Sequence, residues 1–204
     1  MLFAYRRQLD ETLRPGAVYW PGELISRFGL QVGNIEPIAV ADRDEQFEYG
    51  EVITVDTNGR ARKVQAGDTA SRFIGVVNKN ATATMKVLDE QIIGLAPRLT
   101  LSVFRGGRQG VIAVPVQNIL NYDVVGDPVE VPVVAGNPVF VRVTPSTDNP
   151  ALPIGGIETA SNDGECVEWT GVKFAEPAVT PFRDNTQFTT TTGATTYVAG
   201  IELG

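Results

Sequence analysis

Short runs of β-branched residues, each bounded by glycine or proline, constrain the fold of this chain more than any other feature of its sequence. The clearest case is Glu51–Asp56 followed by Ala61–Gln65, two alternating runs joined by a turn at Asn58-Gly59. Alternation of apolar and polar residues predicts half-buried strands, and Asn-Gly accommodates the positive φ angles of a type I′ turn. We therefore expect a β-hairpin over residues 51–65.

A second hairpin is predicted between residues 129–134 and 139–143, with Gly136 in its turn. Pro132 lies inside the first arm and has no N–H to donate, so it marks an edge strand or a bulge. One short helix is expected over residues 2–13, where apolar residues recur near the helical period. Further strands are expected over residues 73–78, 84–87, 99–104, 110–116, 166–174 and 196–203.

Strands joined by short, turn-rich links predict an all-β fold. We expect a compact β-sandwich or β-barrel, β-tulip or jelly-roll-like, with an extended N-terminal arm. Residues 1–46 are assigned to the arm and a connector, and residues 47–204 to the β-rich domain. That domain is expected to contain two related β units, 47–110 and 111–204.

The relation between the two units rests on a loose internal repeat. A glycine-acid pair opens a strand at Gly50 and again at Gly126, and an Ile-Gly step follows at Ile74 and at Ile154. Such a repeat predicts one supersecondary unit used twice. Glycine before a strand is common in β proteins, so a coincidence of turns is the alternative interpretation.

The composition excludes several classes of site. The chain has no histidine and one cysteine, Cys166, which removes the commonest general base and metal ligand together with any internal disulfide. We expect no enzyme activity, no metal and no cofactor; a glycosidase with paired carboxylates is the alternative, because it needs no histidine. A membrane span needs ~20 apolar residues, and no run approaches that length.

Charge is unevenly distributed along the chain. Residues 1–110 contain 14 basic and 13 acidic residues, whereas residues 111–204 contain 3 basic and 11 acidic residues. An acidic surface is repelled by a phosphate backbone, so nucleic acid is not an expected partner. The alternative interpretation is that the acidic residues only keep the protein soluble.

Two segments have the composition of contact surfaces. Loops as long as residues 176–196 are usually functional, although flexibility is the alternative here. The N-terminal arm combines aromatic and arginine residues, the anchors of protein interfaces, although these aromatics could instead cap the barrel as part of a terminal strand. The candidate binding residues of the arm are Phe3, Tyr5, Arg6, Arg7, Arg14, Tyr19 and Trp20.

Three polar motifs favour structural explanations. Asp56–Asn58 differs from the Asp-Thr-Gly motif of aspartic peptidases and falls in a hairpin turn. Cys166 is flanked by acids, which raise a thiol pKa, so it is expected to be a buried or half-buried small residue. A solvated connector is favoured over a calcium loop for an acidic cluster that lacks the loop's glycine and terminal glutamate; its members are Asp42, Asp44, Glu45 and Glu48.

Four stretches together resemble the cement, or decoration, proteins of tailed bacteriophage heads. They are Phe-Ile-Gly-Val-Val at 73–77, Gly-Asp-Pro-Val-Glu-Val at 126–131, Val-Glu-Trp-Thr-Gly-Val-Lys-Phe at 167–174 and Thr-Tyr-Val-Ala-Gly-Ile-Glu-Leu at 196–203. The resemblance extends over most of residues 47–204 as a pattern of strands and turns.

This resemblance implies a protein that binds the outer surface of an assembled head at capsomer junctions and stabilises it against internal DNA pressure. The implied partner is the major capsid protein, the implied assembly a homotrimer or, second, a dimer. The implied location is the exterior of the virion capsid, after synthesis in the host cytoplasm. Another virion component, such as a head fibre, tail or adhesin domain, is the alternative.

Overall fold

In the computed structural model, strands are the main elements of the described part of the chain, which also contains the 3₁₀ helix η1 (Ala70–Arg72). It describes residues 21–25, 34–42, 45, 47–78, 100–106, 110–118, 120–122, 128–131, 133–147, 149–175 and 197–204. The strands are β1 (Leu24–Ile25), β2 (Ile35–Ala39), β3 (Val52–Val55), β4 (Ala61–Lys63), β5 (Phe73–Val77), β6 (Thr100–Phe104), β7 (Val111–Asn118), β8 (Leu120–Tyr122), β9 (Pro128–Glu130), β10 (Pro138–Arg142), β11 (Ile157–Glu158), β12 (Cys166–Phe174) and β13 (Tyr197–Leu203).

The first sheet has the strand order β2-β6-β5-β3-β4. Its two outer strands also meet, because Val40, directly after β2, forms a parallel bridge with Ala61 of β4. The Ala41 N–H supports this bridge by donating to the Ala61 carbonyl over 2.8 Å. The sheet therefore closes on itself as a small five-stranded barrel, which we call the first barrel.

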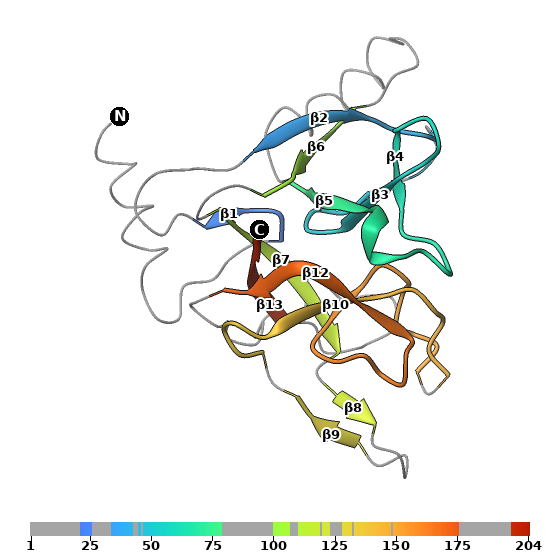
Figure 1. Cartoon of the computed structure of the whole chain (residues 1–204), viewed down its shortest axis with the longest axis vertical. Helices are drawn as coiled ribbons and strands as arrows, with labels where there is room; N and C mark the ends of the chain where they lie inside the picture. Colours follow the sequence, from blue (N-terminus) through green and yellow to red (C-terminus); the bar gives the residue numbers. More distant parts are fainter. Residues whose placement is uncertain are drawn as a thin grey trace, which may run out of the picture.

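The second sheet closes in the same manner. Its order is β1-β7-β11-β10-β12-β13, and β13 pairs in turn with β7. Five strands thus form a second barrel, while β1 adds to the start of β7 and β8 pairs with β9 as a separate ribbon. Figure 1 shows the second barrel below the first, with this ribbon at the lower end. The structure confirms the all-β fold.

The two barrels have the same ring of strand pairings. In each, the first strand pairs antiparallel with the last strand and parallel with the third. The second strand lies between the third and the fourth, with a register shift in its pairing to the fourth. The corresponding strands are β2 and β7, β3 and β10, β4 and β11, β5 and β12, and β6 and β13.

Local hydrogen bonds match as well. Each second strand is preceded by a glycine in the left-handed region, Gly50 at φ 81° and Gly136 at φ 86°. This glycine and its successor exchange backbone hydrogen bonds with the end of the fourth strand. The bonds are Gly50 N–H to Val77 O (2.9 Å) and Val77 N–H to Glu51 O (2.9 Å), matched by Gly136 N–H to Phe174 O (2.8 Å) and Phe174 N–H to Asn137 O (3.0 Å).

This correspondence differs from the repeat predicted above. The prediction aligned Gly50 with Gly126, whereas the structure aligns it with Gly136. It also aligned the Ile-Gly step at Ile74 with the one at Ile154, but Ile74 lies in β5, whereas the strand after Ile154 is β11, the counterpart of β4. Spacing alone misaligned them because the links between corresponding strands differ in length. The strands β1 and β2 lie within residues 1–46, and the proposed domain division stays a prediction.

One apolar cluster joins the two barrels. It includes Val76 and Phe104 from the first barrel and Val141 and Ile201 from the second. The rings of Phe73 and Trp169, from the corresponding strands β5 and β12, meet edge to face with centroids 5.7 Å apart. Burial of these side chains is the main force that holds the barrels together.

The hairpin of β3 and β4 is confirmed, but its turn is not of type I′. Gly59 has φ 74°, whereas Asn58 is not in the positive-φ region. The Asp56 carboxylate explains the difference, because its Oδ1 accepts the N–H groups of Asn58 and Arg60, each at 2.8 Å. This bracing favours a three-residue loop with a single left-handed glycine.

The second predicted hairpin is wrong. β9 pairs with β8, and β10 pairs with β11 and β12 on its two sides. Val139 and Val141 are buried inside the barrel. This burial, and not proximity along the sequence, determines which strands pair with β10. The strands expected over residues 73–78, 99–104, 110–116, 166–174 and 196–203 are present. The strand at 84–87, the helix at 2–13 and Pro132 lie outside the described residues.

Candidate functional site

The seven candidate binding residues of the arm lie outside the described residues, as does the segment 176–196. They are Phe3, Tyr5, Arg6, Arg7, Arg14, Tyr19 and Trp20. The described chain begins at Pro21, directly after Trp20. The place where the arm joins the body is therefore visible, and it is the first candidate site.

Backbone pairing fixes the base of the arm to the second barrel. The Gly22 N–H donates to the Ala113 carbonyl over 2.7 Å, and the Ala113 N–H donates to the Glu23 carbonyl over 2.8 Å. The next two residues form β1, which continues this pairing antiparallel to β7. Pro21 and Gly22 are buried. Residues 21–25 thus belong to the folded body.

The first barrel contacts the same segment through Gly50. A Cβ at this position would lie 2.8 Å from Pro115 Cδ and 3.0 Å from Pro21 Cβ. Glycine is required here for space as well as for its positive φ. The base of the arm therefore passes between the two barrels at a close backbone approach.

Asn78 completes the contact from the end of β5. Its side chain is buried, and Nδ2 donates to the Gly22 carbonyl over 3.1 Å. Together these residues hold both backbone polar groups of Gly22, because its N–H already bonds Ala113. We call Gly50, Asn78, Ala113 and Pro115 the arm socket.

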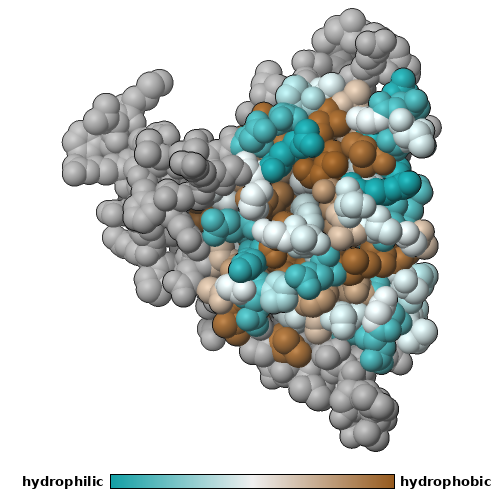
Figure 2. All heavy atoms as spheres, viewed as in Figure 1, coloured by the Kyte–Doolittle hydropathy of each residue, from teal (hydrophilic) through white to brown (hydrophobic). Residues whose placement is uncertain are grey.

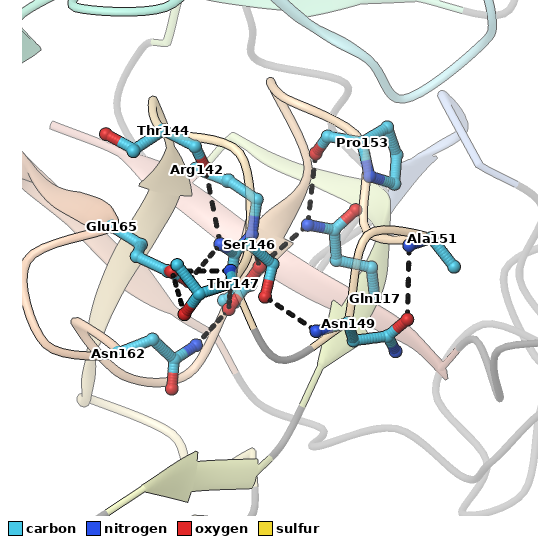
Figure 3. Close-up of polar contacts among 11 residues, drawn as sticks. Gln117, Arg142, Thr144, Ser146, Thr147, Asn149, Ala151, Pro153, Asn162 and Glu165 are labelled. Carbon is cyan, nitrogen blue, oxygen red and sulfur yellow. Dashed lines mark hydrogen bonds and ion pairs between the residues drawn. The ribbon is translucent and has the colours of Figure 1, made fainter.

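A second polar constellation is buried inside the second barrel (Figure 3). Arg142 of β10 is 1% exposed and Glu158 of β11 is fully buried. Arg142 donates to Glu158 from Nε over 2.6 Å and from Nη2 over 3.0 Å. Gln117 of β7 adds a third bond, from Nε2 to Glu158 Oε1 over 2.7 Å. A buried charge of each sign is thus paired and hydrogen bonded.

Glu165 extends this network to the loop after β10. Arg142 Nη1 donates to Glu165 Oε2 over 2.6 Å, and Glu165 Oε1 accepts the N–H and hydroxyl of Thr147. Burial on its own raises the pKa of Glu165, but the bonds from Arg142 and Thr147 outweigh it and hold the pKa below its ordinary value. The carboxylate thus remains ionised at neutral pH and ties two loops to one arginine.

The turn before β12 is shaped around Glu158. Asn162 and Asp163 have φ 47° and 53°, an uncommon conformation for residues other than glycine. The Asn162 side-chain amide donates to Glu158 Oε2, which offsets the strain of this turn. Among the described residues, the buried Oγ1 of Thr159 and Oδ1 of Asn162 have no hydrogen-bond partner.

Cys166 lies at the start of β12 and is buried, as the sequence predicts. Burial raises the pKa of its thiol, and the nearby charge of Glu158 raises it further. A thiol in this state is a poor nucleophile. Cys166 therefore serves as a small packing residue beside the charge network.

The first barrel has one comparable ion pair, nearer its surface. Arg62 of β4 donates two hydrogen bonds to Asp68, over 2.8 and 2.7 Å. Asp68 also accepts the Gln65 N–H over 2.8 Å. Burial alone raises the pKa of Asp68, but these bonds outweigh it and lower the pKa overall. The pair anchors the link between β4 and β5.

The other polar motifs take structural positions where they are described. Glu45 of the acidic cluster accepts the Lys63 N–H over 3.2 Å, whereas Asp44 lies outside the described residues. Within the described part of the chain, no group of three or more acidic or cysteine side chains is arranged to hold a metal ion. No helix in that part is long and apolar enough to cross a membrane.

Comparison with known proteins identifies no relative: no family model, curated protein or solved structure matches this chain.

Sequence reasoning missed both constellations. Arg142 alternates with valines in a strand that is otherwise apolar, and Glu158 follows a buried isoleucine. An oppositely charged pair in two apolar strands was an available indication of a buried ion pair. Asn78 had no such indication, since its partner Gly22 is 56 residues away.

Proposed function

We propose that this chain is a decoration protein that binds the outer surface of an assembled phage head at capsomer junctions. In this role it contacts the major capsid protein on the capsid exterior and stabilises the shell against internal DNA pressure. The resemblance of its strand and turn stretches to cement proteins supports the proposal. The structural observation that carries it is the arm socket, which presents the arginine- and aromatic-rich arm from a fixed point on the body.

The distribution of charge supports an oriented attachment. Arg142 is one of the 3 basic residues of the acidic half, and the network buries it against two glutamates. At the described surface of this half, the acidic Asp163 and Glu168 and the basic Lys173 are exposed. We assume that the capsid exterior is acidic; it would then attract Arg6, Arg7 and Arg14 and repel this half, so that electrostatics orient the subunit.

The described surface fits a body that is soluble on its own. In the view of Figure 2, apolar groups on the described part are interspersed with polar ones. Ile35 and Val134, 39% and 47% exposed, are the large apolar side chains that stand out among the described residues. Binding through the arm is thus favoured over binding through a broad apolar face.

A homotrimer, with a dimer second, is part of the proposal. It rests on the symmetry of a site where three capsomers meet, since closed cyclic symmetry gives each copy identical contacts. An apolar edge near Pro132, which a neighbouring subunit could cover, stays a prediction because Pro132 lies outside the described residues. Among the described strands, β9 of the same segment pairs with β8 alone. Mass photometry of the free protein and of protein released from heads tests this state.

Binding to purified heads tests the function. The full-length protein should sediment with undecorated heads and raise the temperature at which they release DNA. Deletion of residues 1–14 should abolish binding and leave the β fold intact. Trp20→Ala should weaken binding more than Arg6→Ala, because truncation of a buried interface aromatic removes ~2 kcal/mol or more, and an exposed charge pair ~0.2–1 kcal/mol.

Two results would contradict this function. If the protein binds tails or fibres and leaves heads undecorated, the alternative virion role is correct. If the deletion variant saturates heads as the full-length chain does, the contact surface lies elsewhere on the body.

A further inference from the structure

The arm socket contains a side chain that the barrel itself does not require. Asn78 follows β5, and the corresponding residue after β12 is Ala175. Both make the same backbone bond: the Asn78 N–H donates to the Ser102 carbonyl and the Ala175 N–H to the Gly200 carbonyl, each over 2.8 Å. The ring of strands therefore closes equally well with alanine at this position.

The amide of Asn78 has a partner outside its own barrel. Asn78 is 3% exposed, and its Nδ2 reaches the carbonyl of Gly22. Burying an amide is unfavourable unless it is hydrogen bonded. In the second barrel, Ala175 packs in an apolar cluster with Ile25 of β1, where no described backbone carbonyl requires a side-chain donor from this position. The asparagine is thus explained by the arm and not by the barrel.

We propose that Asn78 is a positioning residue for capsid attachment, which holds the base of the N-terminal arm by binding the Gly22 carbonyl in the arm socket. This inference rests on the proposed function. Asn78 does not contact the capsid; it fixes the point and direction in which the arm leaves the body. A pre-positioned arm loses less conformational freedom when it binds, and the affinity rises accordingly.

Two variants and a matched control test the role. Asn78→Ala copies the second barrel, and Asn78→Asp keeps the size of the side chain but removes the donor. Thr54→Val is the control, because Thr54 is fully buried in the same barrel and its hydroxyl bonds the Lys63 carbonyl over 3.2 Å. Asn78→Ala and Thr54→Val each remove one buried side-chain donor to the backbone, so their losses of global stability are comparable. Asn78→Asp also places a carboxylate opposite the Gly22 carbonyl, so its loss is larger.

Hydrogen exchange and head binding are the two readouts. In both Asn78 variants the Gly22 and Ala113 amides should exchange about fivefold faster or more, while amides of β13 exchange as in the wild type, since one hydrogen bond of ~1 kcal/mol corresponds to that factor. Head affinity should fall by a similar factor. Thr54→Val should leave local exchange at Gly22 and head affinity unchanged.

The outcomes separate the two proposals. Wild-type affinity in the Asn78 variants, or unchanged exchange at Gly22, overturns the positioning role. An equal loss of affinity in Thr54→Val also overturns it, because general destabilisation then explains the effect. Failure of the wild-type protein to bind heads overturns the proposed function itself, whatever the variants do.

Discussion

The first and second barrels share one ring of strand pairings but stabilise it with different side chains. The interior of the second barrel contains Arg142, paired with Glu158 at full burial. The ion pair of the first barrel, Arg62 with Asp68, lies nearer the rim, with side chains 11% and 5% exposed. The two barrels thus share the same ring of strand pairings, but their ion pairs are buried to different depths.

One position nevertheless keeps a common role. Arg62 and Glu158 are both the second residue of the third strand, and each forms a two-bond ion pair. Arg62 pairs with Asp68 in the link to the fourth strand. Glu158 pairs with Arg142 of the second strand and contacts the corresponding link through a hydrogen bond from Asn162. The sign of the charge is reversed between the barrels. Each barrel thus has a charged residue at this position, paired with a partner of opposite charge.

Replacing the arginine of each ion pair should give the largest difference between the two barrels in the loss of unfolding free energy. Arg142→Met leaves Glu158 and Glu165 without their cation in a buried site and should lower the free energy of unfolding by about 3–5 kcal/mol. Arg62→Met, nearer solvent, should lower it by about 1–3 kcal/mol. Urea unfolding of both variants measures this. Equal losses would show that depth of burial does not distinguish the two pairs.

The glycines before β3 and β10 give the next comparison. Both have positive φ, so alanine is strained at either, by ~1 kcal/mol. At Gly136 a Cβ would meet nothing within 4 Å, whereas at Gly50 it would contact Pro115 and Pro21. Gly50→Ala should therefore destabilise by a further ~1–3 kcal/mol.

Thermal unfolding of Gly50→Ala and Gly136→Ala checks this order. The same loss in both would mean that the base of the arm moves aside without energetic consequence, and the arm socket would then be a loose contact.

Acidic pH should destabilise both barrels by protonating one ion-paired carboxylate in each, Asp68 in the first barrel and Glu165 in the second. The folded-state pKa values of Asp68 and Glu165 lie below their ordinary values, so each carboxylate stabilises the fold at neutral pH. That stabilisation is lost as the pH falls below ~4 and the carboxylates are protonated. Asp68→Asn and Glu165→Gln should each flatten the dependence of unfolding free energy on pH between about 5 and 2.

Unfolding titrations at several pH values measure this effect. A variant that is less stable at neutral pH but retains the wild-type slope would contradict the assignment of that carboxylate.

The smallest effect is expected at an exposed pair. Arg105 donates to Glu36 over 2.7 Å, but both side chains are about 40% exposed. Water and salt screen such pairs, so Glu36→Gln should leave the unfolding midpoint unchanged. A clear loss of stability, abolished by high salt, would show that surface pairs contribute to the first barrel.

Most strands were predictable because the information that specifies them is local. Alternation of apolar and polar residues marked β3, β4 and β12, and apolar runs marked β5, β7 and β13, since periodicity reflects which faces are buried. The turn at Asn58-Gly59 was also predictable in place but not in type. Its conformation depends on the Asp56 carboxylate, two residues before the dipeptide.

Neither candidate site was predictable in this manner. The arm socket requires Gly22 and Asn78 to meet. The charge network requires side chains from β7, from β10 and from the turn before β12 to converge on Glu158. The periodicity and spacing of residues in the sequence do not indicate these contacts, because the contacts depend on how the whole chain packs.

Local sequence was therefore sufficient for the all-β class, the places of most strands, and the contrast between a neutral and an acidic half. Tertiary structure decided which strands pair, that two rings match, and that Arg142 is buried while Arg62 stays near the rim. The physical reason is the range of the forces. Strand propensity and turns act between neighbours, whereas apolar burial and ion pairing select partners from the whole chain.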